Sequence, residues 1–339
     1  MFKVLVTGGA GYIGSHTCLK LLEEGYSVVV LDNLANGSVE ALKRVQILAN
    51  QSLIFIQGDI RDGECLDRIF QMHQINAVIH FAGLKAVGES QQIPFEYFDN
   101  NISGTLNLLK SMQRANVFNF VFSSSATVYG ETHQSPLDEN MPTGNTTNNY
   151  GYTKYIVEQL LEKLSASDER WSIALLRYFN PVGAHVSGRI GEDPHGVPNN
   201  LIPYVTQVAI GQRDKLAIFG NDYPTLDGTG IRDYVHVMDL ADAHICALKN
   251  RVKSQGCRAW NIATGKGASV LQVINTFEQV NGVEIKYEFV ARRSGDVAVC
   301  FADNRRAKIE LNWTPQFSLE DMLRDSWNWQ INNPNGYVK

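Results

Sequence analysis

Several features of membrane, secreted and nucleic-acid-binding proteins are missing from this sequence of 339 residues. It has no run of about 20 apolar residues, and the apolar stretch within MFKVLVTGG is too short for a signal peptide. It also has no block of Lys and Arg, and its net charge is −5. We therefore expect neither nucleic acid nor a membrane as a partner, and an anionic ligand would need locally placed positive charge.

A disulfide framework is missing as well. The five cysteines are scattered and form no C-x-x-C pair: Cys18, Cys65, Cys246, Cys257 and Cys300. An odd, dispersed set favours reduced thiols, so the sequence predicts a cytoplasmic protein. The apolar fraction of 44% is typical of a globular protein. Because a chain of this length usually outgrows a single core, we expect two lobes.

The chain opens with a strand-like run, a glycine-rich turn, a helix-like pattern and a second strand-like run. The two runs are KVLVT (3–7) and SVVVL (27–31), and the turn contains Gly8, Gly11 and Gly14. Glycine suits each of these places, because the chain turns tightly, approaches a pyrophosphate closely and packs the helix near the strand. The pyrophosphate then lies at the positive N-terminal end of the helix. The segment therefore predicts a dinucleotide site.

An acidic residue ends the second of these strands. Asp32 is placed to accept hydrogen bonds from the hydroxyl groups of an adenosine ribose. Residues 33–37 include no Arg or Lys, so a 2′-phosphate would meet a carboxylate without a compensating cation. The sequence therefore predicts NAD rather than NADP as the cofactor.

Further apolar runs repeat the strand pattern at residues 53–59, 77–83, 120–125 and 172–180, with helix-like segments such as 95–113 between them. This alternation predicts an α/β fold with a doubly wound parallel Rossmann-type sheet. Ligands bind such sheets beyond the carboxyl ends of the strands. The rule places these residues near one crevice: Asp59, Phe81, Ala82, Gly83, Lys85, Ser125 and Phe179. For Asp59 alone, an ordinary turn residue after Gly58 is the competing interpretation.

The segment NNYGYTKY contains a tyrosine and a lysine four residues apart, Tyr150 and Lys154. Such a pair lies on one helix face and, taken alone, is most often an ordinary pair of neighbours. After a dinucleotide fold and a serine at a strand end, catalysis is favoured. A phenol has a pKa near 10 and becomes a useful base only when a nearby positive charge stabilises its phenolate. Ser125 can bond the reacting oxygen, whereas Tyr152 and Tyr155 lack the lysine partner and are interpreted as packing or surface residues.

The glycine turn, Ser125 and the Tyr150–Lys154 pair resemble the extended short-chain dehydrogenases/reductases. More narrowly, long segments over nearly the whole chain resemble the UDP-glucose 4-epimerase family: GDIR, HFAGLKAVGES, SSSATVYG, LLRYFNPVGAH, PNNLIPY, AIFGNDYPT with the RDY-HV-DLA region, and WNWQ-NNP-GY. The resemblance implies an isomerase of galactose metabolism that inverts C4 of UDP-hexoses and so interconverts UDP-galactose and UDP-glucose.

That resemblance also implies a mechanism. Tyr150 would take the proton of the sugar 4-hydroxyl while hydride passes from C4 to a tightly held NAD. The flat 4-keto sugar would turn over about its diphosphate and receive hydride and proton on its other face. Lys154 would hold the nicotinamide ribose and lower the pKa of Tyr150, and Ser125 would bridge to the reacting oxygen.

The family pattern extends the expected sites over two lobes, an NAD-binding domain at 1–181 and a smaller α/β UDP-sugar lobe at 182–339, with chain crossings between them. Beyond the residues named above, the implied NAD site includes Tyr12, Ile13, Asn33, Asn36, Gly37, Ile60 and Asn100. Arg232 and Arg293 suit a diphosphate, since guanidinium groups match phosphate oxygens. The implied substrate site also includes Asn180, Asn200, Leu201, Ala217, Ile218, Phe219, Asp296 and Cys300, besides Ser125 and Tyr150.

Competing interpretations stay open at this point. A sugar-nucleotide 4,6-dehydratase shares the fold and the Tyr–Lys pair, but it places Asp-Glu where this chain has Ala126-Thr127. A non-catalytic NAD-dependent sensor would be expected to lose the catalytic residues. The residues His236, Asp239 and His244 resemble metal-ligand spacing only loosely, and we expect no metal.

Two further expectations come from the resemblance. Several bacterial epimerases have a bulky tyrosine beside the sugar where this chain has Cys300, and a small residue there leaves room for a 2-N-acetyl group. UDP-N-acetylhexosamines are therefore hypothesised as additional substrates. The family also predicts a homodimer formed through helices near 95–113 and 150–165.

Overall fold

The computed structural model describes residues 2–130, 134–194, 196, 198, 200–293 and 296–337. The chain forms two compact units. The first consists of Met1–Gly130, Pro142–Arg177 and Ala241–Trp260, and the second of Glu131–Met141, Tyr178–Leu240 and Asn261–Lys339. The chain therefore passes between the units several times. The functional assignment of the two lobes stays a prediction.

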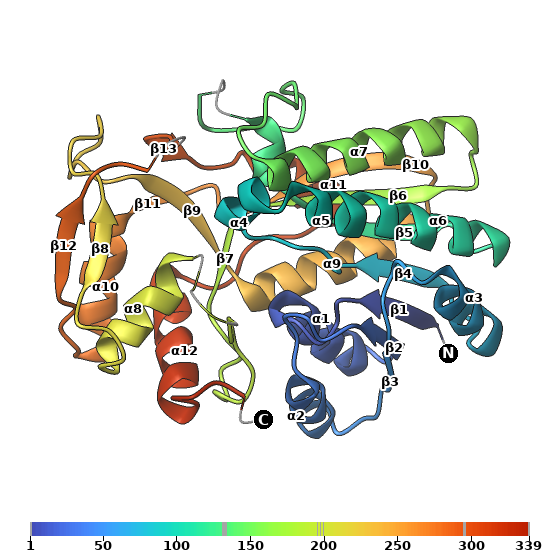
Figure 1. The fold of residues 1–339 in the computed structure, drawn as a ribbon, viewed down its shortest axis with the longest axis horizontal. Coiled ribbons are helices and arrows are strands. Elements are labelled where there is room, and N and C mark those ends of the chain that lie inside the picture. Colours follow the sequence, from blue (N-terminus) through green and yellow to red (C-terminus); the bar gives the residue numbers. More distant parts are fainter. Residues whose placement is uncertain are drawn as a thin grey trace. The chain divides into compact units, whose positions relative to one another are not determined.

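The first unit is built on a seven-stranded sheet (Figure 1). Its strands are β1 (Lys3–Thr7), β2 (Ser27–Asp32), β3 (Ile54–Gln57), β4 (Ala77–His80), β5 (Asn119–Ser125), β6 (Ser172–Tyr178) and β10 (Gly256–Ile262). Their order is β10-β6-β5-β4-β1-β2-β3, and β1 pairs in parallel with both β2 and β4. The expected doubly wound Rossmann-type sheet is confirmed. Nearly every residue of β1, β2, β4, β5 and β6 is buried, as expected for parallel strands that are covered on both faces.

Helices cover both faces of this sheet. They are α1 (Tyr12–Glu23), α2 (Val39–Ala49), α3 (Gly63–Met72), α4 (Val87–Gln92), α5 (Pro94–Tyr97), a π-helix (Phe98–Ser103), α6 (Gly104–Arg114), a 3₁₀-helix (Ala126–Tyr129), α7 (Asn149–Ser167) and α9 (Val237–Arg251). Leu66 of α3, Met112 of α6 and Leu161 of α7 share one core with Leu5 and Phe120 of the sheet. Figure 1 shows α1, α2 and α9 on the opposite face.

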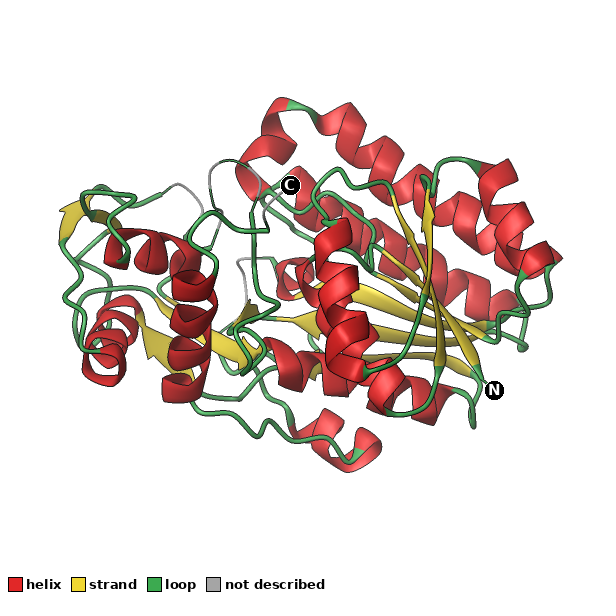
Figure 2. Ribbon diagram, turned by 90° about the horizontal axis from the view of Figure 1, so that it is seen from below, coloured by secondary structure: helices red, strands yellow, loops and turns green. Residues whose placement is uncertain are grey.

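The second unit combines short strands with packed helices (Figure 2). Its elements are β7 (Asn180–Val182), α8 (Leu201–Ala209), β8 (Leu216–Phe219), β9 (Ile231–His236), β11 (Gly267–Ser269), α10 (Val270–Asn281), β12 (Tyr287–Val290), β13 (Val299–Cys300), α11 (Arg305–Leu311) and α12 (Leu319–Asn332). β9 pairs with β7, β11 and β13, and β8 pairs with β12. Val205 of α8, Phe277 of α10 and Leu323 of α12 form its core.

Two segments differ from the sequence-based expectation. The helix expected over 95–113 consists of three pieces, because a π-helix separates α5 from α6. The strand expected over 172–180 ends at Tyr178, and β7 begins at Asn180 in the second unit. Among the residues that the structure describes, none of the helices combines the length and the apolar character needed to cross a membrane.

Candidate active site

The glycine-rich turn between β1 and α1 leaves no room for side chains. Gly8 has a positive φ of 72°, and a Cβ atom there would lie 2.6 Å from the backbone nitrogen of Ala82. A Cβ atom on Gly14 would lie 2.2 Å from the carbonyl oxygen of Gly8. The helix begins after Gly11, which has no side chain to occupy the N–H groups of the first turn. The turn therefore exposes a helix N-terminus that a phosphate can approach closely.

Asp32 lies buried at the end of β2, beside this turn. One carboxylate oxygen accepts the backbone N–H of Ala10 at 2.9 Å, and the other accepts that of Leu34 at 2.8 Å. Burial raises the pKa of Asp32, and the two N–H donors oppose the shift. A Cβ atom on Gly37 would lie 3.1 Å from the carboxylate. The acid is thus held in one orientation, and each oxygen can still accept a further hydrogen bond.

A second polar group lies at the end of β3. The Asn33 side chain donates to the Asp59 carboxylate at 2.9 Å, and Arg61 makes a charge-assisted hydrogen bond to the same carboxylate at 2.8 Å. The Arg61 guanidinium holds the pKa of Asp59 well below its usual range. Ile60 is buried, and a Cβ atom on Gly104 would meet its side chain at 2.7 Å. The structure therefore brings together Asn33 and Asp59, two residues of the predicted NAD site.

The segment after β4 is held by an asparagine that sequence reasoning missed. Asn101, in the π-helix, accepts the backbone N–H of Leu84 at 2.8 Å and donates to the Leu84 carbonyl at 2.9 Å. It also donates to the Thr153 hydroxyl on α7 at 3.0 Å, and it accepts the side-chain amide of Asn100 at 3.0 Å. One buried amide thus fixes the loop of Phe81, Ala82, Gly83 and Lys85 to the helix of the Tyr–Lys pair. The π-helix is a type of helical distortion that is frequent at functional sites.

The serine, tyrosine and lysine of the predicted catalytic group lie together at the end of β5 and the start of α7. Lys154 donates to the Ser123 carbonyl at 2.7 Å, and its Nζ lies 5.9 Å from the centroid of the Tyr150 ring. Ser125 accepts the backbone N–H of Thr127 at 3.2 Å and hydrogen-bonds Tyr150. The helix begins after Asn148, whose side chain accepts the N–H of Gly151. This cap places Tyr150 in the first helical turn.

The ionisation of this group depends on its burial. Burial raises the pKa of the Tyr150 phenol, and the hydrogen bond to Ser125 opposes that shift. Burial also lowers the pKa of Lys154 to about 8, with the charge of Glu158 opposing it. The sequence led us to expect that Lys154 would lower the pKa of Tyr150. In the protein without ligands, burial instead raises this pKa. Tyr152 is 45% exposed, in agreement with its interpretation as a surface residue.

In the second unit, one carboxylate joins the two arginines that were predicted to bind diphosphate. Asp296 pairs with Arg232 at 3.4 Å and with Arg293 at 3.2 Å. The Arg293 guanidinium also lies over the Phe219 ring, 4.4 Å from its centroid. In β8, Ala217 and Phe219 are exposed while the side chain of Ile218 is buried, so Ile218 can offer a ligand only its backbone. These residues form an aromatic and positively charged surface patch.

Three strands bring other predicted substrate residues alongside Arg232. Cys300 of β13 is the register partner of Arg232 of β9, and Asn180 of β7 is the partner of Tyr234. Asn200 is the N-cap residue of α8, next to Leu201, and its amide donates to Glu192 at 3.1 Å. Phe179 also belongs to the second unit and is buried. The described geometry thus groups Asn180, Arg232 and Cys300 on one small sheet.

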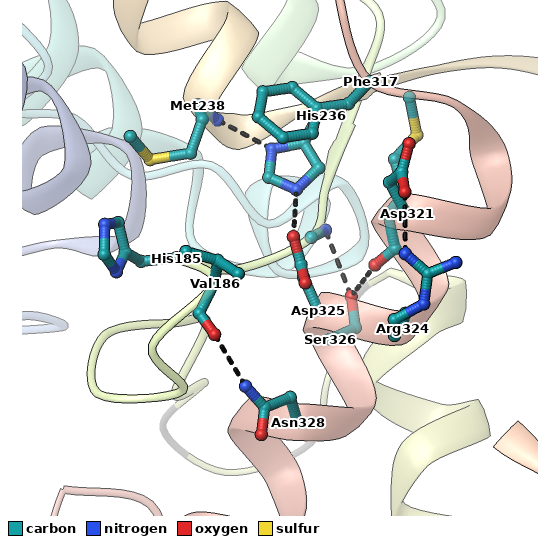
Figure 3. Close-up of polar contacts among 12 residues, drawn as sticks. His185, Val186, His236, Met238, Phe317, Asp321, Arg324, Asp325, Ser326 and Asn328 are labelled. Carbon is teal, nitrogen blue, oxygen red and sulfur yellow. Dashed lines mark hydrogen bonds and ion pairs between the residues drawn. The ribbon is translucent and has the colours of Figure 1, made fainter.

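A buried histidine that sequence reasoning assigned no role holds the end of this sheet (Figure 3). His236 accepts the backbone N–H of Met238 at 3.0 Å, so its other ring nitrogen donates to Asp325 of α12 at 3.2 Å. Its ring stacks on Phe317 with centroids 4.2 Å apart. The N–H of Gly183, just after β7, donates to Ser326 of α12. These contacts fix the ends of β7 and β9 against α12.

Asp239 accepts the backbone N–H groups of Gln316 and Phe317. Among the described parts of the chain, no group of three or more His, Cys, Asp or Glu residues could hold a metal ion.

Comparison with known proteins decides the family. A family model described as GDP-mannose 4,6 dehydratase matches residues 5–326. A UDP-glucose 4-epimerase of Bacillus subtilis strain 168 is 56% identical, with 98% of each chain covered, and one of Mus musculus is 54% identical, with 99% of each covered. The chain belongs to the UDP-glucose 4-epimerase family.

Solved structures agree with this membership. A UDP-glucose 4-epimerase from Stenotrophomonas maltophila, with bound NAD and formylated UDP-arabinopyranose, has a TM-score of 0.96 and 49% identity, covering 98% of this chain and 99% of that one. One from Bifidobacterium longum in complex with NAD and UDP has a TM-score of 0.95 and 49% identity, covering 98% of this chain and 99% of that one. The resemblance to the epimerase family that the sequence motifs indicated is confirmed.

Proposed function

We propose that this epimerase interconverts UDP-galactose and UDP-glucose with Tyr150 as the acid and base at the sugar 4-hydroxyl. Inversion at C4 of UDP-hexoses is the reaction of the family to which the chain belongs. The observation that supports the residue assignment is the arrangement of Ser125, Tyr150 and Lys154 between β5 and α7, in which Ser125 and Lys154 are buried and Tyr150 is partly buried. The assignment of the individual residues is our proposal.

NAD is the cofactor, and the residues of the first unit fit it. Side chains at Gly8 or Gly14 would clash with the backbone, so glycine keeps this turn tight, and a tight turn of this kind lets a pyrophosphate approach the backbone closely. Asp32 is fixed by two N–H donors and offers free lone pairs to ribose hydroxyls. NAD held by these residues would supply the hydride acceptor and donor for C4 of the sugar.

The chain's own residues handle the proton. Tyr150 takes the proton of the 4-hydroxyl at its phenolate oxygen and later returns it to the new alcohol. Lys154 is held by the Ser123 carbonyl and supplies the positive charge that stabilises this phenolate. Ser125 donates to the reacting oxygen and keeps the proton acceptor aligned.

In this proposal the second unit holds the UDP. Arg232 and Arg293 offer guanidinium groups to the diphosphate, and Asp296 is free to exchange its arginine partners for ribose hydroxyls. The exposed face of Phe219 suits stacking by a uracil ring. A grip on the nucleotide alone leaves the sugar free to present either face.

A dehydratase needs acidic residues that this chain does not have at the corresponding positions. Elimination of water from C5 and C6 needs an additional acid and base. The positions where dehydratases place Asp-Glu are Ala126 and Thr127, which begin the 3₁₀-helix after β5. We therefore assign the match to the dehydratase model to the shared fold.

The proposed function is tested by mixing the purified protein with UDP-galactose and coupling the product to UDP-glucose dehydrogenase. We expect NADH formation that depends on the protein and on UDP-galactose. A substrate with deuterium at C4 should give a product that keeps the deuterium at C4. No product, or loss of the deuterium to solvent, would overturn the proposal.

UDP-N-acetylhexosamines are a second proposed substrate pair, and Cys300 is the observation that favours them. Cys300 is a small side chain at the register position next to Arg232. Turnover of UDP-GalNAc in a direct assay would support this extension, and Cys300→Tyr should abolish it while UDP-galactose turnover continues. Turnover of UDP-GalNAc no higher than background in the unaltered protein would end it.

We also propose a cytoplasmic homodimer. All five cysteines are free, which suits a reducing compartment. Phe95 of α5 is 81% exposed, and Tyr152 of α7 is 45% exposed near Phe98, which gives the helices expected at the dimer contact an apolar surface. Analytical ultracentrifugation should give twice the chain mass, and Phe95→Lys should reduce it to one chain.

A further inference from the structure

A buried carboxylate lies one helical turn beyond the catalytic lysine. Glu158 of α7 is fully buried, and both of its oxygens are used. Arg177 of β6 donates to one at 2.7 Å and to the other at 3.0 Å. The Ser124 hydroxyl donates to Glu158 at 2.5 Å. Arg177, itself 3% exposed, also donates to the Tyr129 hydroxyl at 3.1 Å.

A pair of this kind is not explained by stability alone. Removing two charges from water costs so much that apolar residues of equal volume often serve a core as well or better. The pair, however, connects the elements that present the catalytic group: α7 carries Tyr150 and Lys154, and β5 ends at Ser125. A buried ion pair in such a place can fix one register between two elements.

Two consecutive residues of β5 form hydrogen bonds with residues in two consecutive turns of α7. The Ser123 carbonyl accepts the Lys154 ammonium, and the Ser124 hydroxyl donates to Glu158. Ser125 follows directly. The distance from Ser125 to the Tyr150 hydroxyl is therefore set by these two bonds, because both fix how far along the strand the helix lies.

We propose that Glu158 and Arg177 are positioning residues of the epimerase. Glu158 holds α7 in one register on β5. Its negative charge keeps the Lys154 ammonium protonated, and the positive charge of Arg177 partly offsets that effect. The inference rests on the proposed function and deepens it by naming the groups that act through Lys154.

The charges around Lys154 predict the direction in which each substitution shifts the pKa of this lysine. The titratable and charged groups that face Lys154, or Glu158 behind it, are Tyr150, Glu162, His80, Arg177 and Cys257. Burial lowers the pKa of Lys154 to about 8, and Glu158 opposes this shift. Loss of the Glu158 charge lowers the pKa of Lys154 further, because Arg177 is then uncompensated. Loss of the Arg177 charge raises it, because Glu158 is then uncompensated.

The experiment compares the pH profiles of kcat for Glu158→Gln, Arg177→Gln and Ser124→Ala between about pH 6 and about pH 10. The alkaline limb reports deprotonation of Lys154. We expect it to move to lower pH in E158Q and to higher pH in R177Q. On that limb, a downward shift of about one pH unit lowers kcat about tenfold, and an upward shift of the same size raises it about tenfold. Ser124→Ala removes a hydrogen bond and no charge, so its limb should stay in place.

Movement of the two limbs in the same direction, or no movement in either, would overturn the proposal, since a purely structural role predicts a uniform loss at all pH values. If the Gln variants do not fold, Glu158→Asp and Arg177→Lys keep the charges and disturb the register. They should lower kcat with an unchanged KM for UDP-galactose and an unmoved limb; a rise in KM alone would also overturn it. Failure of the proposed function is distinguishable, because the unaltered protein would then show no turnover.

Discussion

The two units hold their predicted functional side chains in opposite ways. In the first unit, Lys154 is 6% exposed and Ser125 is 9% exposed, and backbone groups fix both of them. In the second unit, the Arg293 side chain is 59% exposed and pairs with Asp296 through a single contact. Proton transfer needs atoms aligned to a fraction of an ångström, whereas recognition of a diphosphate by charge does not. The difference agrees with our proposal that the first unit transfers the proton and the second unit binds the UDP.

The ion pairs of the two units differ in the same way. Arg177–Glu158 is nearly inaccessible to solvent, with exposed side-chain fractions of 4% and 0%, and breaking such a pair strands a charge in the core. Arg293–Asp296 is open to solvent, and pairs of that kind contribute little to stability. Substitutions should therefore change kcat and stability in the first unit and KM in the second.

The largest effect is expected at Tyr150. Tyr150→Phe removes the only atom that we propose to exchange the proton of the 4-hydroxyl, so kcat should fall by about 10³-fold with little change in KM. Steady-state kinetics in the coupled assay measures both constants. Tyr152→Phe, on the same helix but 45% exposed, is the matched control and should retain full activity. A Tyr150→Phe enzyme that turns over at the unaltered rate would contradict the assignment of proton transfer to the first unit.

At Arg293 we expect a smaller effect, which changes KM rather than kcat. Arg293→Gln removes a charged partner of the diphosphate, so KM for UDP-galactose should rise by about 50-fold with kcat nearly unchanged. The melting temperature should stay the same, because the Asp296 pair is exposed. The neighbouring Arg292 pairs with Asp222 and packs on Tyr223, and Arg292→Gln provides the control. Equal changes in KM for both variants would place the diphosphate elsewhere.

Local pattern was enough to predict the first sheet but not the helices near the site. The runs 3–7 and 27–31 are apolar throughout, and strands buried on both faces have that composition. The segment 95–113 also has a helical composition, yet it contains a π-helix whose Asn101 bonds Leu84 and Thr153. Those partners are distant in the sequence, so no local signal shows them.

The same limit applies to the candidate site. Tyr150 and Lys154 were found because they share one helix face at a fixed spacing. Glu158 has that same spacing from Lys154, and this signal could have identified it. Its partner Arg177 lies on β6, and only the folded sheet brings the two charges together. The return of α9 to the first unit likewise has no marker in the sequence, because it depends on contacts with residues far away in the chain, such as that of the buried His244 with Phe81, whose ring centroids lie 4.7 Å apart.

The smallest effect concerns the stability of the first unit in acid. His80 of β4 accepts the Thr7 hydroxyl at 2.6 Å and donates to the Thr105 hydroxyl at 2.9 Å, since Thr105 gives its own proton to the Asn101 carbonyl. Burial, with the Lys154 charge adding to it, lowers the pKa of His80 to about 3 from an ordinary value of 6.5.

Between those two values the unfolded chain binds the proton that the folded chain excludes, so stability falls as the pH falls. From about pH 7 to about pH 5 this residue should account for a loss of about 2 kcal/mol in the free energy of unfolding. Urea unfolding at both pH values measures the loss, and His80→Gln should reduce it by that amount. His73→Gln, at the partly exposed end of α3, is the control and should leave the loss unchanged. An equal acid loss in His80→Gln and in the unaltered protein would show that His80 does not cause the loss.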